Sequence, residues 1–178
     1  MPAYEEDLAY IHDVGFGHFA KRAAPAVLRM LRQSGITKGL VVDLGCGSGI
    51  WARELTSAGY DVLGVDISQS MLALARQKAP HARFVHASLL KVTLPACAAV
   101  TSIGECVNYL FDARNNQREL ARFFARVYQA LRAGGTFIFD SLEPGQVKGP
   151  GPRVRNAEGP DWATLVQTEE DTQKRLLT

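Results

Sequence analysis

Short apolar runs alternate with segments of helical periodicity along most of the chain. In the periodic segments, apolar residues recur every three or four positions, as in amphipathic helices, and the longest such segment spans 115–132. The apolar runs are typical of buried parallel strands and lie at 40–42, 60–66, 82–86, 97–103 and 136–140. This alternation predicts an α/β fold, an open and mainly parallel doubly wound sheet with a ligand site at the carboxyl ends of its strands.

Breaks in the pattern divide the chain into three parts. Residues 1–35 are expected to form a helical leader, or lid, interrupted by a glycine-punctuated break at Asp13–Gly17. Residues 36–142 form the predicted α/β core. Residues 143–178 begin with a Pro/Gly-rich linker that reaches Pro160, and the segment from Trp162 onward predicts a β-hairpin.

The first predicted strand ends in a glycine turn, Asp43-Leu-Gly-Cys-Gly-Ser-Gly49. Glycines at alternate positions allow a tight turn and the close approach of a ligand, and the helix start behind them favours an anionic group. A phosphate-binding loop requires a lysine after its last glycine, and a dinucleotide fingerprint requires a glycine at position 50, where this chain has Ile50. Asp43, two positions before the first glycine, suits a ligand that carries an ammonium group.

A second acid follows the second predicted strand. Asp66 lies 21 residues after Gly45 on the neighbouring strand, a distance at which a carboxylate reaches ribose hydroxyls, and Ser68 is a good N-cap for the next helix. Asp43, the glycine spacing and Asp66 together resemble motif I and the following strand of the class I S-adenosylmethionine (SAM) methyltransferases. The resemblance covers roughly residues 36–142. It implies transfer of a methyl group from SAM to an acceptor nucleophile, with S-adenosylhomocysteine (SAH) as product.

The resemblance also implies roles for individual residues. It places Asp43 and the turn residues Gly45, Cys46, Gly47 and Gly49 on the methionine part of SAM, and Asp66 on the ribose. It places adenine between Ile67 and Leu89, with Met71 lining the pocket. Ser88 stands near the place where many relatives have an acid that accepts a hydrogen bond from the adenine amino group.

The sequence says less about the residues that contact the methyl acceptor than about those that contact SAM. Relatives bring the acceptor to the end of the fourth strand, where Glu105 and Tyr109 lie, and the leader with His12 is the expected lid. Glu105 is either a ligand contact or a helix-start acid, and His12 either packs or takes part in catalysis. The DNA-methylating signature Asn/Asp-Pro-Pro-aromatic is absent from this region, which favours a small-molecule acceptor over a nucleic acid.

Length, charge and cysteine content limit the number of domains and the kinds of partner that the sequence allows. A length of 178 residues fits one domain, and a net charge of +2 is too small to indicate a nucleic acid or an anionic membrane as partner. No apolar stretch approaches the length of a membrane span, and the N-terminus lacks a signal-peptide pattern. Three cysteines without C-x-x-C spacing favour neither a disulfide framework nor a metal site, and predict a reducing cytoplasm.

The sequence leaves two questions to the structure, namely the activity and the C-terminal end of the sheet. A nicotinamide-dependent oxidoreductase and a non-catalytic SAM-binding protein are the alternatives to a methyltransferase. The sheet of class I methyltransferases typically continues beyond the fifth strand, but only 38 residues follow Asp140 here. We therefore expect the fifth strand at an edge of the sheet. Either the chain is a fragment of a longer protein, with residues 143–178 part of an insertion, or it is a short protein whose edge is covered by a partner or a second copy in a homodimer.

Overall fold

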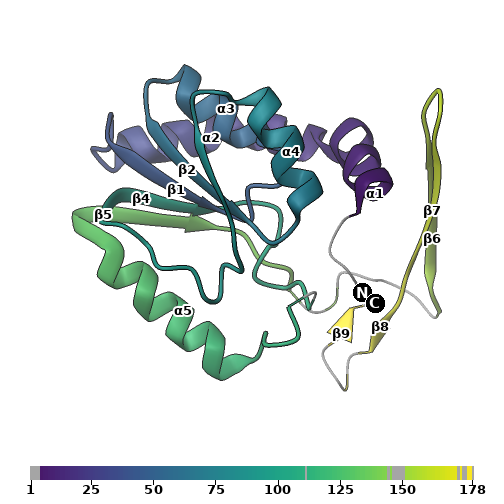
Figure 1. Cartoon of the computed structure of the whole chain (residues 1–178). Helices are drawn as coiled ribbons and strands as arrows, with labels where there is room; N and C mark the ends of the chain where they lie inside the picture. The colour runs from purple at the N-terminus through teal and green to yellow at the C-terminus, as the bar shows by residue number, and fades with distance from the viewer. Residues whose placement is uncertain are drawn as a thin grey trace. The chain divides into compact units, whose positions relative to one another are not determined.

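The structure is a computed structural model that describes residues 5–110, 112–143, 145, 151–171, 173, 176 and 177. The chain divides into two compact units, Met1–Ser141 and Leu142–Thr178. The larger unit is a sheet between two layers of helices (Figure 1). The smaller unit contains antiparallel strand pairs.

A five-stranded sheet forms the centre of the larger unit. Its strands are β1 Leu40–Leu44, β2 Asp61–Asp66, β3 Arg83–His86, β4 Cys97–Ser102 and β5 Leu131–Phe139. They are all parallel and lie in the order β3-β2-β1-β4-β5. The open parallel sheet confirms the predicted fold class.

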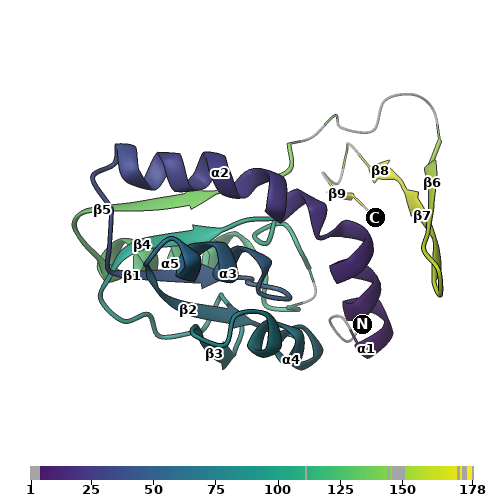
Figure 2. The ribbon, with the colours of Figure 1, turned by 90° about the horizontal axis from the view of Figure 1, so that it is seen from above.

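Helices cover both faces of this sheet (Figures 1 and 2). The helices are α1 Glu6–Ile11, the π-helical turn η1 His12–Phe16, α2 His18–Gln33, α3 Ile50–Ser57, α4 Gln69–Lys78 and α5 Gln117–Ala130. Helices α2, α3 and α4 lie on one face, and α5 lies on the other.

Successive strand residues supply the two cores in turn. Val41 packs with Leu31 of α2 and Leu55 of α3, while Val42 packs on the opposite face with Phe123 of α5. All of these side chains are buried, because a parallel sheet with helices on both faces leaves neither face to water. Asp43 follows Val41 by two positions in β1 and therefore points to the same face of the sheet as Val41.

The predicted break in the leader is wrong. Residues 13–16 lie in the π-helical turn η1, and Gly17 joins η1 to α2 in a helix-like conformation. Gly17 has φ −60°, which any residue can adopt, so its backbone conformation does not require glycine; a Cβ there would lie 2.5 Å from Ile50 Cδ1. This glycine therefore permits close packing of the leader on α3.

The fifth strand begins earlier than predicted. β5 starts at Leu131, which pairs with Cys97, and its register then shifts so that Thr136 pairs with Ala99. Gly134, at φ +77°, lies in the irregular stretch between these pairs. Helix α5 therefore ends at Ala130, within the segment that the sequence assigned to helix.

The smaller unit corrects the predicted linker. Strand β6, Arg153–Glu158, pairs antiparallel with β7, Ala163–Thr168, and β8, Glu170–Asp171, pairs with β9, Leu176–Leu177. The turn between β6 and β7 is closed by a hydrogen bond from Gly159 N–H to Trp162 O, 2.8 Å. Pro152, Gly159 and Pro160 thus lie at the ends of strands and in the turn between them. Residues 144 and 146–150 of the predicted linker, and 172, 174, 175 and 178 of the predicted hairpin, lie outside the described residues.

Candidate active site

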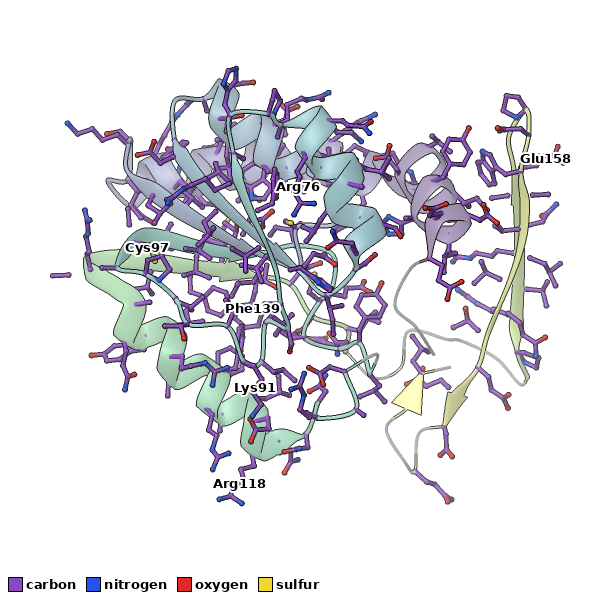
Figure 3. All side chains as sticks on the ribbon, viewed as in Figure 1. Arg76, Lys91, Cys97, Arg118, Phe139 and Glu158 are labelled. Atoms are coloured by element: carbon purple, nitrogen blue, oxygen red, sulfur yellow. The ribbon has the colours of Figure 1, made fainter. Side chains whose placement is uncertain are left out.

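Strand direction gathers the predicted site residues at one end of the sheet. Figure 3 shows Cys97, where β4 begins, and Phe139, where β5 ends, at opposite ends of the sheet. Asp43 is the penultimate residue of β1, and Asp66 is the last of β2. Since the strands are parallel, both acids lie at the carboxyl edge, where ligands bind in open α/β sheets.

The glycine turn after β1 is held against β2 by backbone hydrogen bonds. The N–H groups of Gly45 and Cys46 both donate to Val65 O, at 2.8 and 3.0 Å. A Cβ on Gly45 would lie 2.4 Å from Cys106 Sγ, and one on Gly49 would lie 2.8 Å from Ala75 Cα, so neither position has room for a side chain. Gly47 differs: at φ +52°, its Cβ position faces open space.

Asp66 connects this turn to the start of α4. Its Oδ2 accepts from Gly47 N–H at 2.8 Å, and its Oδ1 accepts from Ser68 N–H at 2.8 Å. Burial raises the pKa of Asp66, although these hydrogen bonds oppose the shift. Ser68 caps α4 through its Oγ, which accepts from the N–H of the buried Met71 at 3.1 Å.

Asp43 ends a buried chain of side-chain hydrogen bonds. Trp51 Nε1 donates to Thr101 Oγ1 at 3.0 Å, and Thr101 Oγ1 donates to Asp43 Oδ1 at 2.9 Å. Asp43 is 2% exposed. Burial raises its pKa to about 7, and the charge of Asp66 adds to the shift. A positively charged ligand beside Asp43 would stabilise the carboxylate that burial disfavours.

The leader reaches the same turn through Asp13 of η1. Asp13 Oδ1 accepts hydrogen bonds from Ser48 Oγ, at 2.5 Å, and from Lys78 Nζ of α4. Burial by itself would raise the pKa of Asp13, but the bonds from Lys78 and Ser48 outweigh it and lower this pKa. His12, the neighbouring candidate, lies 6.2 Å from Phe16 between ring centroids, and burial lowers its pKa.

The segment after β4 is fixed by an acid at the end of β5. Asp140 Oδ1 accepts from Gly104 N–H at 2.8 Å and Glu105 N–H at 3.1 Å. Glu105 has φ +61°, and among the described residues it is the one residue other than glycine with a positive φ. Such strain persists where surrounding contacts impose it, and it is common at functional sites. Burial and the charge of Asp140 raise the pKa of Glu105. Tyr109, further along, is 40% exposed.

The segment after β3 contains the two residues predicted on adenine. Ser88 Oγ donates to Asp112 Oδ2, and Leu89 is half-buried against the α5-side core. His86 Nε2 lies 2.8 Å from Ile67 O, and because a carbonyl only accepts, the ring nitrogen is the donor. Ile67, which is predicted on the other side of adenine from Leu89, is 37% exposed.

The structure brings together Asp43, the glycine turn and Asp66, and it attaches the leader to them. Sequence patterns missed Asp13, Lys78, Thr101 and Asp112, because each acts through a partner far away in the chain. Asp140 was visible as the acidic tip of an apolar strand, but its partners after β4 were not.

Other features of the described part of the chain limit the chemistry. All three cysteines are free thiols, and burial raises the pKa of Cys106 to about 12. Within the described ranges, no cluster of three His, Cys, Asp or Glu side chains is placed to hold a metal ion. Among the described helices, none has both the length and the apolar character of a membrane span.

Comparison with known proteins gives one family. Residues 41–135 match a family model described as a methyltransferase domain. A methyltransferase of Geobacillus sp. (strain WCH70) is 33% identical over 103 residues, 56% of this chain and 41% of that protein. The dTDP-3-amino-3,6-dideoxy-α-D-glucopyranose N,N-dimethyltransferase of Streptomyces fradiae is 27% identical over 128 residues, 70% of this chain and 50% of that protein. The chain thus spans about half or less of the length of these curated relatives.

Solved structures show the same architecture. DesVI of Streptomyces venezuelae has a TM-score of 0.78 to this chain, with 22% sequence identity, over 94% of this chain and 72% of that one. At this identity the likeness establishes the fold.

Proposed function

Because the match to the methyltransferase domain covers more than half of the chain, the chain belongs to the class I SAM-dependent methyltransferase family, and we propose that it transfers a methyl group from SAM to a small-molecule nucleophile. The proposed products are the methylated acceptor and SAH. Neither the family match nor the relatives support the nicotinamide-dependent alternative.

The observation that carries this proposal is the convergence of two acids on one glycine turn. Asp43 lies before the turn, and Asp66 binds Gly47 N–H within it. The Cβ position of Gly47, which is bonded to Asp66, faces open space, and this fits close approach of a ligand. SAM is positively charged at its sulfonium and ammonium groups, and it carries a ribose with two hydroxyls. Buried carboxylates suit both parts.

When bound, SAM supplies a methyl group that its sulfonium already activates. The residues of this chain then have to hold and align the reactants, and alignment is worth about 7–11 kcal/mol in favourable cases. Asp43 would hold the ammonium end, and Asp66 the ribose. Ile67 and Leu89 would enclose adenine, with Ser88 accepting from its amino group.

We place the acceptor between the leader and the segment after β4. Glu105 lies at this end of the sheet, and its raised pKa favours acceptance of a proton from an acceptor hydroxyl or ammonium group. Tyr109 and His12 are the further candidates to contact the acceptor. The sugar N-methyltransferase among the relatives acts on a small molecule, which supports this class of acceptor.

Two further expectations belong to this proposal. The free cysteines support a reducing cytoplasm as the location. We propose no nucleic-acid or membrane partner, since the net charge is only +2.

Calorimetric titration of the chain with SAM, SAH, NAD and ATP tests the cofactor. We expect binding of SAM and SAH, and none of NAD. Binding of NAD in place of SAM would overturn the proposal. Turnover is then tested by measuring the SAH released when the chain is incubated with SAM and a panel of amine and hydroxyl acceptors. Tight binding of SAM and SAH without turnover of any acceptor would favour a non-catalytic SAM-binding protein.

Alanine variants test the acceptor side once an acceptor is found. Glu105→Ala and Tyr109→Ala should lower kcat more than they weaken SAM binding, because both residues are placed on the acceptor. Equal turnover in folded variants would remove these two residues from the acceptor site.

A further inference from the structure

Asp112 lies far from the glycine turn in the sequence, yet it contacts one of the residues placed on adenine. Its carboxylate is 13% exposed and receives four hydrogen bonds. Ser88 Oγ and Arg114 Nη2, at 3.1 Å, donate to Oδ2. Arg114 Nε, at 2.8 Å, and Arg114 N–H, at 3.1 Å, donate to Oδ1.

These bonds fix the direction of the Ser88 hydroxyl proton. A carboxylate offers about four lone-pair positions and no donor, so Asp112 is saturated and can only accept. The bonds from Arg114 lower the pKa of Asp112 to about 2, which keeps it ionised at neutral pH. Ser88 must therefore donate its one proton to Asp112.

The hydrogen-bonding capacity that Ser88 has left matches one type of ligand atom. Its Oγ accepts from Leu90 N–H at 3.1 Å, which uses one of its two lone pairs. No contact with another described residue uses the second lone pair. With its proton committed, Ser88 is an acceptor only, and it matches a donor such as the 6-amino group of adenine.

The segment that carries Ser88 is also fixed in place. Arg126 of α5 donates to Leu90 O, and Lys91 Nζ lies 2.8 Å from Glu119 Oε2. Figure 3 shows Lys91 extending toward α5. These contacts hold the backbone on either side of Leu90 against the helix, so the Ser88 oxygen has a defined position.

We propose that Asp112 is a positioning residue that makes Ser88 an obligate hydrogen-bond acceptor, and that this pair selects the 6-amino purine of the cofactor against a 6-oxo purine. The inference rests on the proposed function, because it takes the adenine of SAM to lie at Ser88. It gives Asp112, from the segment after β4, the task that a carboxylate directly after β3 has in many relatives.

Calorimetry with SAH and its 6-oxo analogue, S-inosylhomocysteine, tests the pair. We expect the wild-type chain to bind SAH tenfold or more tighter, because a site built to receive an N–H rejects an analogue that offers an acceptor. Asp112→Asn allows the amide to donate to Ser88 and frees the hydroxyl proton for a 6-oxo group, so the preference should fall to about threefold or less. Ser88→Ala should lose the preference to a similar extent, and adding Asp112→Asn to it should change nothing further.

Two further variants keep the test decisive. Asp61→Asn, an exposed acid at the start of β2, should retain the wild-type preference. Asp112→Ala removes the carboxylate that receives the Ser88 proton, so it should reduce the preference even if Asp112→Asn does not fold. Folded Asp112→Asn or Asp112→Ala variants with the wild-type preference would overturn the proposal, and so would a wild-type chain that binds both ligands equally. Failure of the wild-type chain to bind SAH would instead refute the proposed function.

Discussion

Asp66 is the residue whose removal most directly tests the cofactor site. Asp66→Ala should weaken SAM binding about a hundredfold or more, since two hydrogen bonds to a charged group are each worth about 1.5–3 kcal/mol. It also releases Gly47 N–H and Ser68 N–H, so a modest loss of thermal stability is expected. Asp66→Asn is the matched control, because it keeps an oxygen for one of these N–H groups. Unchanged SAM affinity in a folded Asp66→Ala chain, measured by calorimetry, would exclude Asp66 from the site.

Asp43 makes the site sensitive to pH. Its folded-state pKa of about 7 lies above the ordinary value of 3.8. The folded, ligand-free chain therefore holds an extra proton between these values, and its stability should fall as pH rises from about 4 to 7. A cationic ligand binds the ionised form of Asp43, so SAM affinity should rise as the pH rises towards 7. Below pH 7 the affinity should weaken by up to about tenfold per pH unit.

The Asp43→Asn variant separates these effects. It should bind SAM more weakly at pH 8 and show little change in affinity between pH 5.5 and 8, while the wild-type affinity rises over this range. Isothermal titration at three pH values in buffers of different ionisation enthalpy would also detect the proton released on binding. A wild-type affinity that does not vary with pH would show that Asp43 is already ionised in the free chain.

At the scale of elements, the leader is attached to the glycine turn by one carboxylate. Asp13→Ala removes the bonds to Ser48 and Lys78, so the free energy of unfolding should fall by about 1–3 kcal/mol. Amide exchange across α1 and η1 should accelerate, and SAM should bind several-fold more weakly because the turn loses its support. Asp7→Ala, an exposed acid on α1, is the control and should leave all three measurements unchanged. Wild-type exchange rates in Asp13→Ala would show that other contacts hold the leader.

At the scale of the whole molecule, β5 is an edge of the described sheet and carries an exposed aromatic side chain, Phe139. Phe124, Phe137 and Phe139 pack against one another, and Phe139 is 42% exposed. An apolar edge strand pairs readily with another chain. We therefore expect the 178-residue chain to self-associate in light scattering coupled to size exclusion. Phe139→Lys should reduce the associated mass, and Val85→Lys on the opposite edge strand, at a residue of similar exposure, should not. A wild-type chain that remains monomeric at high concentration would contradict this expectation.

Much of the larger unit was predictable because its signals are local. Apolar runs gave the five strands, and the acids and glycines around β1 and β2 gave the family and its cofactor. The boundaries that failed depended on contacts between elements. Gly17 looked like a helix break but serves packing on Ile50, and Arg153–Glu158 looked like a linker but gained strand structure by pairing with β7.

The sequence by itself determined the alternation of strands and helices, the position of the glycine turn and the two acids beside it, because each of these depends on residues close together in the chain. Only the tertiary structure decided which distant side chains complete the site. Thr101 meets Asp43, Asp13 meets Ser48, and Asp112 meets Ser88 across 58, 35 and 24 positions. Such pairs form where parallel strands end side by side and the connecting segments fold over them, and no short-range pattern in the sequence records that geometry.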